Sequence, residues 1–259
     1  MTPEALVRAI YRKLARAWGP QHWWPAETRF EVIAGAILTQ NTSWKNVESA
    51  LDSLRSAGAL SLAGIRGLPH EQLEKLVRSS GYYRQKAKRL KAFVAFVDES
   101  YGGSLAKMFQ TPTHQLRAAL LALNGVGPET ADSILLYAGH HEIFVVDAYA
   151  RRILERHAAI QPKAKYDEIR VLMERALQRE KSTSYPSART TQRRPIAHDP
   201  SPMSLAERSP LAQVYNEMHG LLVQVGKHYC HRSEPACEHC PLQKLLPEGH
   251  PALTDSEKQ

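Results

Sequence analysis

Apolar residues recur along this chain with the spacing of α-helices rather than β-strands. Thr2 and Pro3 have the residue types of a helix N-cap and first turn, and an apolar stripe at Leu6, Ile10 and Leu14 follows them. The same periodicity predicts helices over residues 28–38, 44–57, 69–80, 85–101, 113–123, 128–139, 148–157, 166–178 and 211–229. One strand-like run, residues 143–146, is too short to found a sheet. The pattern therefore predicts an all-α fold.

The segment from Glu180 to Pro210 lacks this periodicity and is rich in Ser, Thr, Pro and Arg. Such a segment cannot bury enough apolar surface to offset the entropy lost when it orders. We therefore expect a mobile insertion over residues 180–210. Its arginines at 189, 193 and 194 are candidates for phosphate contacts, although a solvated loop is the simpler interpretation.

The formal net charge is +8 and the sequence pI is about 9.4, which suits a polyanionic partner such as nucleic acid. Charge alone leaves such a partner open, because basic proteins often bind nothing acidic. No apolar run reaches the ~18 residues that a membrane span needs. The basic residues near the start are scattered, unlike those of a signal peptide. We expect a cytoplasmic protein without a membrane partner.

Three cysteines, Cys230, Cys237 and Cys240, lie within eleven residues. In a chain without an export signal, such clustering favours metal binding over disulfides. The spacing is compatible with an iron–sulfur cluster or with a zinc site completed by a nearby histidine. A loop without metal is the remaining alternative.

The most informative stretch runs from Leu123 to Tyr149. Residues 124–127, Asn-Gly-Val-Gly, predict a tight turn between two helices, and Pro128 opens the second helix. Gly125 and Gly127 permit positive φ and the close approach of another backbone, and N–H groups at such a turn can bind phosphate. An ordinary helix–helix corner would have the same pattern.

Asp147 follows the apolar run at residues 143–146 and precedes a predicted helix. Its residue type and position predict an N-cap. A capping carboxylate is held rigidly and stays ionised, which also suits an electrostatic catalyst. The two roles are compatible.

These motifs resemble the endonuclease III family of DNA glycosylases. The matching features are Leu-x-Gly-Val-Gly-x-x-Thr-Ala followed by Val-Asp, the segment Ile37–Thr42 around Gln40, and the spacing of the three cysteines. The resemblance covers about residues 28–157 and 211–242. It implies two helical subdomains with a DNA-binding cleft between them. Residues 29–141 would form a six-helix subdomain with the helix-hairpin-helix motif, and residues 1–28 with 142–259 the second, with the cysteine loop.

The chain departs from the family pattern at two positions. Glu129 stands where bifunctional members carry a lysine nucleophile, and a carboxylate cannot form a Schiff base with the sugar. Leu246 stands where the cluster loop would have its fourth cysteine. A possible 4Fe–4S cluster would therefore have an incomplete ligand set.

Further segments resemble the bacterial 3-methyladenine DNA glycosylase III branch, which also has glutamate in the lysine position. They are Trp23–Pro25, Leu38–Thr42, Gly81–Leu90, Glu129–Leu135 and Val145–Tyr149. The resemblance implies monofunctional removal of an alkylated purine from double-stranded DNA by a monomer that associates with the nucleoid. The alternatives are a glycosylase and lyase for damaged or mismatched pyrimidines, and a DNA-binding protein without catalysis.

The resemblance and the residue chemistry together assign roles. Asp147 would stabilise the oxocarbenium-like sugar and orient or deprotonate water. Tryptophans would attract a cationic base, and paired tryptophans before a proline favour this role over core packing. The pocket residues would be Trp23, Trp24, Trp44 and Glu129. The DNA contacts would be Gln40 and Asn41, Gly125, Val126 and Gly127 of the hairpin, and Lys86 in a basic helix face with Lys88, Arg89 and Lys91.

Overall fold

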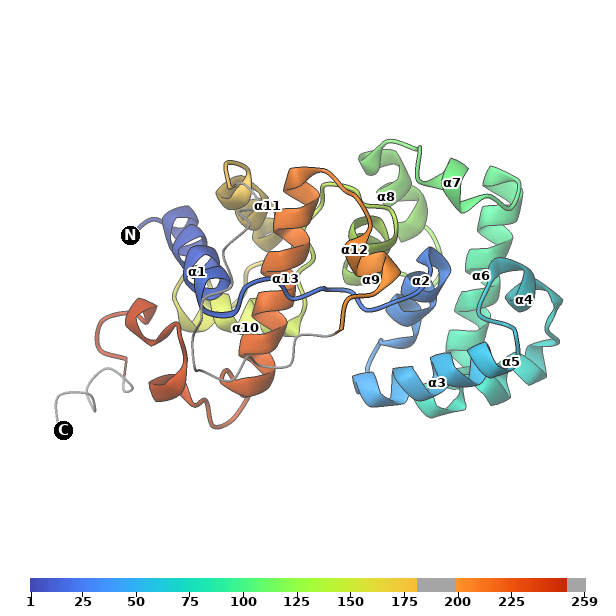
Figure 1. Ribbon diagram of the computed structural model, residues 1–259, viewed down its shortest axis with the longest axis horizontal. Coiled ribbons are helices and arrows are strands. Elements are labelled where there is room, and N and C mark those ends of the chain that lie inside the picture. Colours follow the sequence, from blue (N-terminus) through green and yellow to red (C-terminus); the bar gives the residue numbers. More distant parts are fainter. Residues whose placement is uncertain (181–198, 251–259) are drawn as a thin grey trace. The chain divides into compact units, whose positions relative to one another are not determined.

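The computed structural model of the chain describes residues 1–180 and 199–250, and its regular elements within these ranges are all helices (Figure 1). The predicted all-α fold is confirmed. The chain divides into two compact units. Unit 1 comprises Met1–Pro25 and Glu142–Gln259, and unit 2 comprises Ala26–His141. None of the helices in the described ranges is both long and apolar enough to cross a membrane.

Unit 2 is built around α2, which is buried from Phe30 to Leu38 and packs against α3, α6 and α9. A helix buried on all sides in this way lies at the centre of its unit. The helices of this unit are α2 (Arg29–Leu38), α3 (Trp44–Ser56), α4 (Leu62–Gly67), α5 (His70–Leu76), η1 (Arg78–Ser80), α6 (Tyr83–Tyr101), α7 (Leu105–Met108), α8 (Thr113–Leu121), α9 (Pro128–Ser133) and the π-helical turn η2 (Ile134–Ala138).

Two short helices in unit 2, α4 and α7, were not predicted. They have six and four residues, too few for helical periodicity to stand out. Each begins at a capping serine: Ser61 accepts a hydrogen bond from the Gly64 N–H, and Ser104 accepts one from the Lys107 N–H. Local capping, rather than an apolar stripe, therefore fixes where both begin.

In unit 1, α13 packs against α1, α10 and α11 (Figure 1). Residues 218–226 of this helix are buried without interruption. The helices of this unit are α1 (Pro3–Trp18), α10 (Ala148–Arg156), α11 (Tyr166–Leu177), α12 (Pro202–Leu205), α13 (Pro210–His228), η3 (Cys237–His239) and η4 (Gln243–Leu245). The core of the unit therefore lies along α13.

Most of the insertion predicted at residues 180–210, including its three arginines, lies outside the described residues. The described end of the segment is not a loop throughout. It contains α12, where Met203 is buried and Ser201 caps the helix by accepting from the Ser204 N–H. A capping serine and a first-turn proline fix this single turn without any apolar periodicity.

Candidate active site

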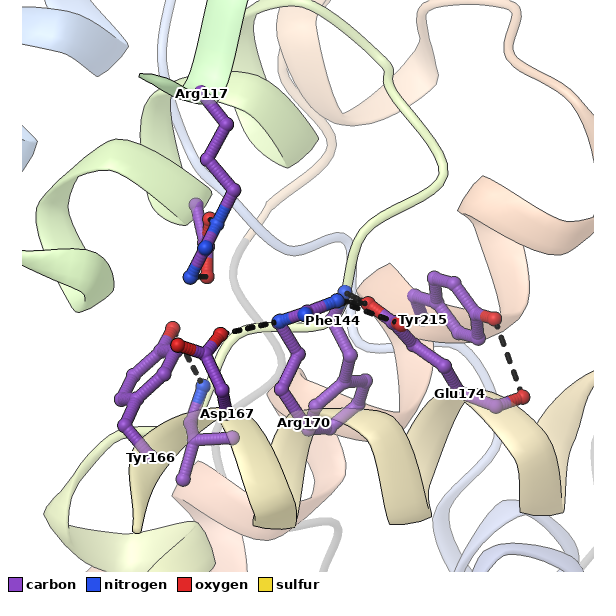
Figure 2. A network of polar contacts seen from close by, with 9 residues as sticks. Arg117, Phe144, Tyr166, Asp167, Arg170, Glu174 and Tyr215 are labelled. Carbon is purple, nitrogen blue, oxygen red and sulfur yellow. Dashed lines mark hydrogen bonds and ion pairs between the residues drawn. The ribbon is translucent and has the colours of Figure 1, made fainter. Parts of the chain in front are cut away.

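Residues 143–146, which form neither helix nor strand, lead to Asp147 and are held against α11 by a clamp of hydrogen bonds to its side chains (Figure 2). The Phe144 N–H donates to Glu174 Oε1 at 3.0 Å, and the Val146 N–H donates to the Tyr166 hydroxyl at 3.3 Å. A buried backbone N–H needs a partner, and no strand of the described chain supplies one here. The clamp therefore fixes the backbone that carries Asp147.

The Glu174 side of this clamp is itself held in place (Figure 2). Arg170 donates from Nη1 to both Glu174 carboxylate oxygens, each at 2.8 Å, and from Nε to Asp167 at 3.0 Å. The Tyr215 hydroxyl donates to the Glu174 carbonyl at 3.3 Å, and burial raises the pKa of Tyr215. The phenol therefore keeps its proton and remains a donor at neutral pH.

Asp147 is the N-cap of α10, as its sequence position predicted. Its Oδ1 accepts a hydrogen bond of 2.7 Å from the Ala150 N–H. Its Oδ2 lies 3.6 Å from Nε2 of His219 on α13, and the side chain is 15% exposed. One oxygen therefore anchors the carboxylate to its helix. The second oxygen, Oδ2, is not used by the cap, so the carboxylate can still stabilise a positive charge next to it.

Trp23 and Trp24 are both buried, with ring centroids 5.5 Å apart. A side chain at Gly220 of α13 would approach the Trp23 Cβ to 3.0 Å, and the His219 ring centroid lies 6.0 Å from that of Trp23. The sequence favoured a pocket role over core packing for this pair; both side chains are buried in the structure, and the missing side chain at Gly220 leaves room for Trp23. Trp23, Trp24, His219 and Asp147 thus belong to one unit.

The other two expected pocket residues, Trp44 and Glu129, belong to unit 2. Trp44 is the first residue of α3, and its Nε1 donates to Glu48 at 2.8 Å. Glu129 is exposed in the first turn of α9, where a carboxylate is favoured by the helix dipole.

The predicted turn joins α8 to α9 in unit 2. Gly125 has a φ of 80° and Val126 is buried. Gly127 instead has extended backbone, with a φ of −89°, so of the two glycines it is Gly125 that uses the left-handed region. A side chain at Gly127 would meet nothing within 4 Å. The fold therefore does not require glycine there, whereas close approach of a partner backbone would.

Gln40 lies against this hairpin. Its Nε2 donates to the Gly125 carbonyl and to Thr130 Oγ1, both at 2.9 Å, and its Oε1 accepts from Arg89 Nη1. The neighbouring Asn41 is exposed with a φ of 53°. The hairpin thus fixes the Gln40 amide, and insertion of Gln40 into a DNA gap would require these bonds to break.

Lys86 is not part of the exposed basic face that the sequence predicted. It is 1% exposed, and its Nζ donates to the carbonyls of Leu38 at 2.8 Å and Ser80 at 2.5 Å. Burial, with a smaller effect of Arg89, lowers the pKa of Lys86 to about 8. The sequence did contain a sign of this burial, because Lys86 stands four residues before Leu90 and therefore on the buried face of α6. Lys86 therefore ties the end of α2 to α6.

The three cysteines line one pocket with His157, Gln243 and Leu246, among other residues. Arg156 Nη1 lies 3.1 Å from Cys230 Sγ, and burial raises the pKa of Cys240 to about 11. Within residues 1–180 and 199–250, no group of three or more Cys, His, Asp or Glu is arranged to hold a metal ion. The described residues therefore do not fit a four-ligand cluster.

Completing the four-thiolate set is expected to create a cluster site. Leu246 lines the same pocket as the cysteines, so Leu246→Cys should hold more iron and sulfide per chain than wild type after anaerobic reconstitution. Iron, sulfide and visible absorbance provide the measurement. Leu246→Ser is the control, since it adds a polar group without a thiolate. Equal iron in all three proteins would contradict the expectation.

Sequence reasoning missed three residues around Asp147: Tyr166, Glu174 and His219. Tyr166 and Glu174 lie on α11, and the pattern of polar residues in this helix predicts only a face exposed to solvent. His219 had a usable signal, because it interrupts an apolar run that continues with Leu221 and Leu222. A buried polar residue within such a run commonly has a specific partner.

A helical chain with a glycine hairpin between two helices, and an aspartate capping the next helix, has the architecture of a helix-hairpin-helix DNA glycosylase. Residues 34–179 match the HhH-GPD superfamily of base excision DNA repair proteins, and the chain belongs to this superfamily. It is a base excision repair DNA glycosylase, and its partner is DNA containing a damaged base.

Relatives along the whole chain agree with this assignment. A protein of Methanocaldococcus jannaschii, provisionally assigned as a DNA repair glycosylase, is 41% identical over 93% of this chain and 95% of its own. Endonuclease III of Thermotoga maritima is 23% identical over 92% of this chain and 91% of its own. The H. pylori 3-methyladenine DNA glycosylase MagIII, bound to 1,N6-ethenoadenine, has a TM-score of 0.66 and 30% identity, with 88% of this chain and 98% of that chain covered.

The hairpin offers a prediction about DNA affinity. Gly127→Ala should leave folding unchanged, because the added methyl group meets open space. It should weaken binding to abasic-site DNA about tenfold, or ~1.4 kcal/mol, if a phosphate approaches the Gly127 N–H. Melting temperature and the dissociation constant test both statements.

Gly125→Ala is the matched comparison for Gly127→Ala. Its φ of 80° strains any other L residue, and an added methyl group would have to displace the Arg89 side chain. This variant should lose stability by about 1–2 kcal/mol from the left-handed backbone alone. Unchanged DNA affinity in a folded Gly127→Ala protein would remove Gly127 from the DNA contact.

Proposed function

We propose that this glycosylase is monofunctional and hydrolyses the N-glycosidic bond of N3-alkylated purines such as 3-methyladenine. The observation that carries the proposal is that Asp147 and two buried tryptophans lie in one unit. His219 lies next to both Asp147 and Trp23, and Trp23 lies next to Trp24. The similarity to MagIII, at 30% identity, supports the substrate class. The exposed Glu129 in the lysine position supports the absence of a lyase step.

The chemistry of the substrate sets what the chain must do. A purine nucleotide alkylated at N3 carries a positive charge on its ring, so its glycosidic bond is already weakened and needs little acid assistance. Cleavage sends the bonding electron pair to the base and leaves an oxocarbenium-like sugar. Asp147 would stabilise that cation and accept a proton from the water that attacks the anomeric carbon. The tryptophan faces would hold the cationic base after it is flipped out of the duplex.

Duplexes that each contain one lesion test the substrate class. The protein should release 3-methyladenine faster than it releases oxidised pyrimidines or mismatched thymine. A chain that released only pyrimidines would overturn the alkylpurine assignment. A chain that bound abasic DNA and released no base would be a DNA-binding protein without catalysis.

Reaction type is a separate prediction. Because Glu129 cannot form a Schiff base, the product strand should stay intact until it is heated in alkali. Borohydride should trap no protein–DNA adduct, and Glu129→Ala should still release base. Glu129→Lys restores the lysine of the bifunctional pattern and is the matched variant for trapping. A strong adduct with the wild-type protein would contradict the monofunctional assignment.

A further inference from the structure

His219 lies next to Asp147 in the interior of unit 1. It is 4% exposed on α13, and its Nε2 lies 3.6 Å from Asp147 Oδ2. Its ring centroid is 6.0 Å from that of Trp23 and 6.4 Å from that of Phe144. The imidazole is therefore confined between the tryptophan, the segment that leads to Asp147 and the Asp147 carboxylate itself.

Asp147 itself has little freedom to move. Its backbone is fixed by the clamp on residues 144 and 146, and Oδ1 is fixed by the cap to Ala150. Oδ2 faces His219 at a distance just beyond hydrogen-bond range. Catalytic hydrogen bonds are often long in a ligand-free enzyme and shorten when the substrate binds. A small rotation of the carboxylate would bring Oδ2 to Nε2.

The charge of His219 matters as much as its position. Burial lowers the pKa of His219, and the nearby Asp147 only partly opposes this effect. The imidazole is therefore neutral at neutral pH. A neutral neighbour can donate to a carboxylate without cancelling its charge, whereas a lysine or arginine in this place would compete with the cationic sugar for Asp147.

We propose that His219 is a positioning residue for the glycosylase reaction, which holds Asp147 Oδ2 in the orientation that faces the sugar. The inference rests on the proposed catalytic role of Asp147. It extends that role to a second helix, because α13 then sets the orientation of a carboxylate that α10 carries. In this role His219 acts through Asp147 and not through a contact of its own with the base or the sugar.

Two substitutions separate positioning from packing. Gln can place its amide N–H near the site of Nε2, whereas Leu fills similar volume without a donor. His219→Leu should lower the single-turnover rate of base release roughly ten- to hundredfold, because small misplacements of a catalytic group have effects of this size. His219→Gln should stay within roughly threefold of wild type on the same reasoning. Melting temperature and affinity for abasic-site DNA should be unchanged in both variants.

The double variant with Asp147→Asn gives a readout that a merely structural role would not change. Without the carboxylate, His219→Leu should cause no further loss, since interacting residues are non-additive. Three outcomes would overturn the positioning role and leave the proposed function intact. They are an additive loss in the double variant, a wild-type rate in His219→Leu, and equal impairment by Gln and Leu. Wild-type protein that released no base from any lesion would overturn the proposed function, and the positioning role with it.

Discussion

Asp147→Asn should reduce base release by roughly a hundred- to ten-thousandfold, the range expected for loss of a catalytic carboxylate. The reason is specific to the charge. Asn retains an oxygen that accepts from the Ala150 N–H, so α10 keeps its cap. It loses the negative charge that would stabilise the sugar cation, and it cannot take a proton from water. Single-turnover kinetics on a 3-methyladenine duplex measure the loss.

The control for Asp147→Asn is the integrity of the fold. Because Asn caps helices about as well as Asp, the melting temperature should change little, and binding to abasic-site DNA should remain. Asp147→Ala removes the cap as well and should cost about 1 kcal/mol of stability in addition to the activity. Full activity in Asp147→Asn would show that Asp147 is only a cap.

Trp24→Leu should lower the release of 3-methyladenine roughly ten- to hundredfold, because a stacked base is worth ~1–3 kcal/mol. Trp24→Phe should retain most of the rate, since it keeps an aromatic face for the cationic base. The loss in Trp24→Leu should be smaller for neutral 1,N6-ethenoadenine, where the attraction between charge and ring is absent. Rates on both lesions, measured side by side, test this.

Burial makes the stability control essential for this prediction. Trp24 is only 7% exposed, so a substitution that opens a cavity would weaken the activity on all substrates through unfolding. Leu and Phe limit that cavity, and abasic-site binding reports the folded fraction without any base to stack. Equal losses for the charged and the neutral lesion would point to packing and leave the substrate class to the resemblance alone.

The sequence by itself determined the class of fold and the family. Thr2 caps α1 and Asp147 caps α10, each where its residue type predicted. These signals are local, because a cap and a helical stripe depend on residues within one or two turns. The hairpin motif has the same locality. A single sequence was therefore enough to identify the family's glycine turn and the aspartate that follows it.

The tertiary structure decided which side chains meet across long separations in the sequence. The neighbours of Lys86 in the sequence predict an exposed basic helix face, but its ammonium group donates to the carbonyl of Leu38, 48 positions earlier, as well as to that of nearby Ser80. Trp23 is buried because Gly220 lies opposite it. His219 faces Asp147 across 72 positions of the chain because α13 packs on α10. Periodicity and capping contain no information on such pairings, since these depend on how the helices pack.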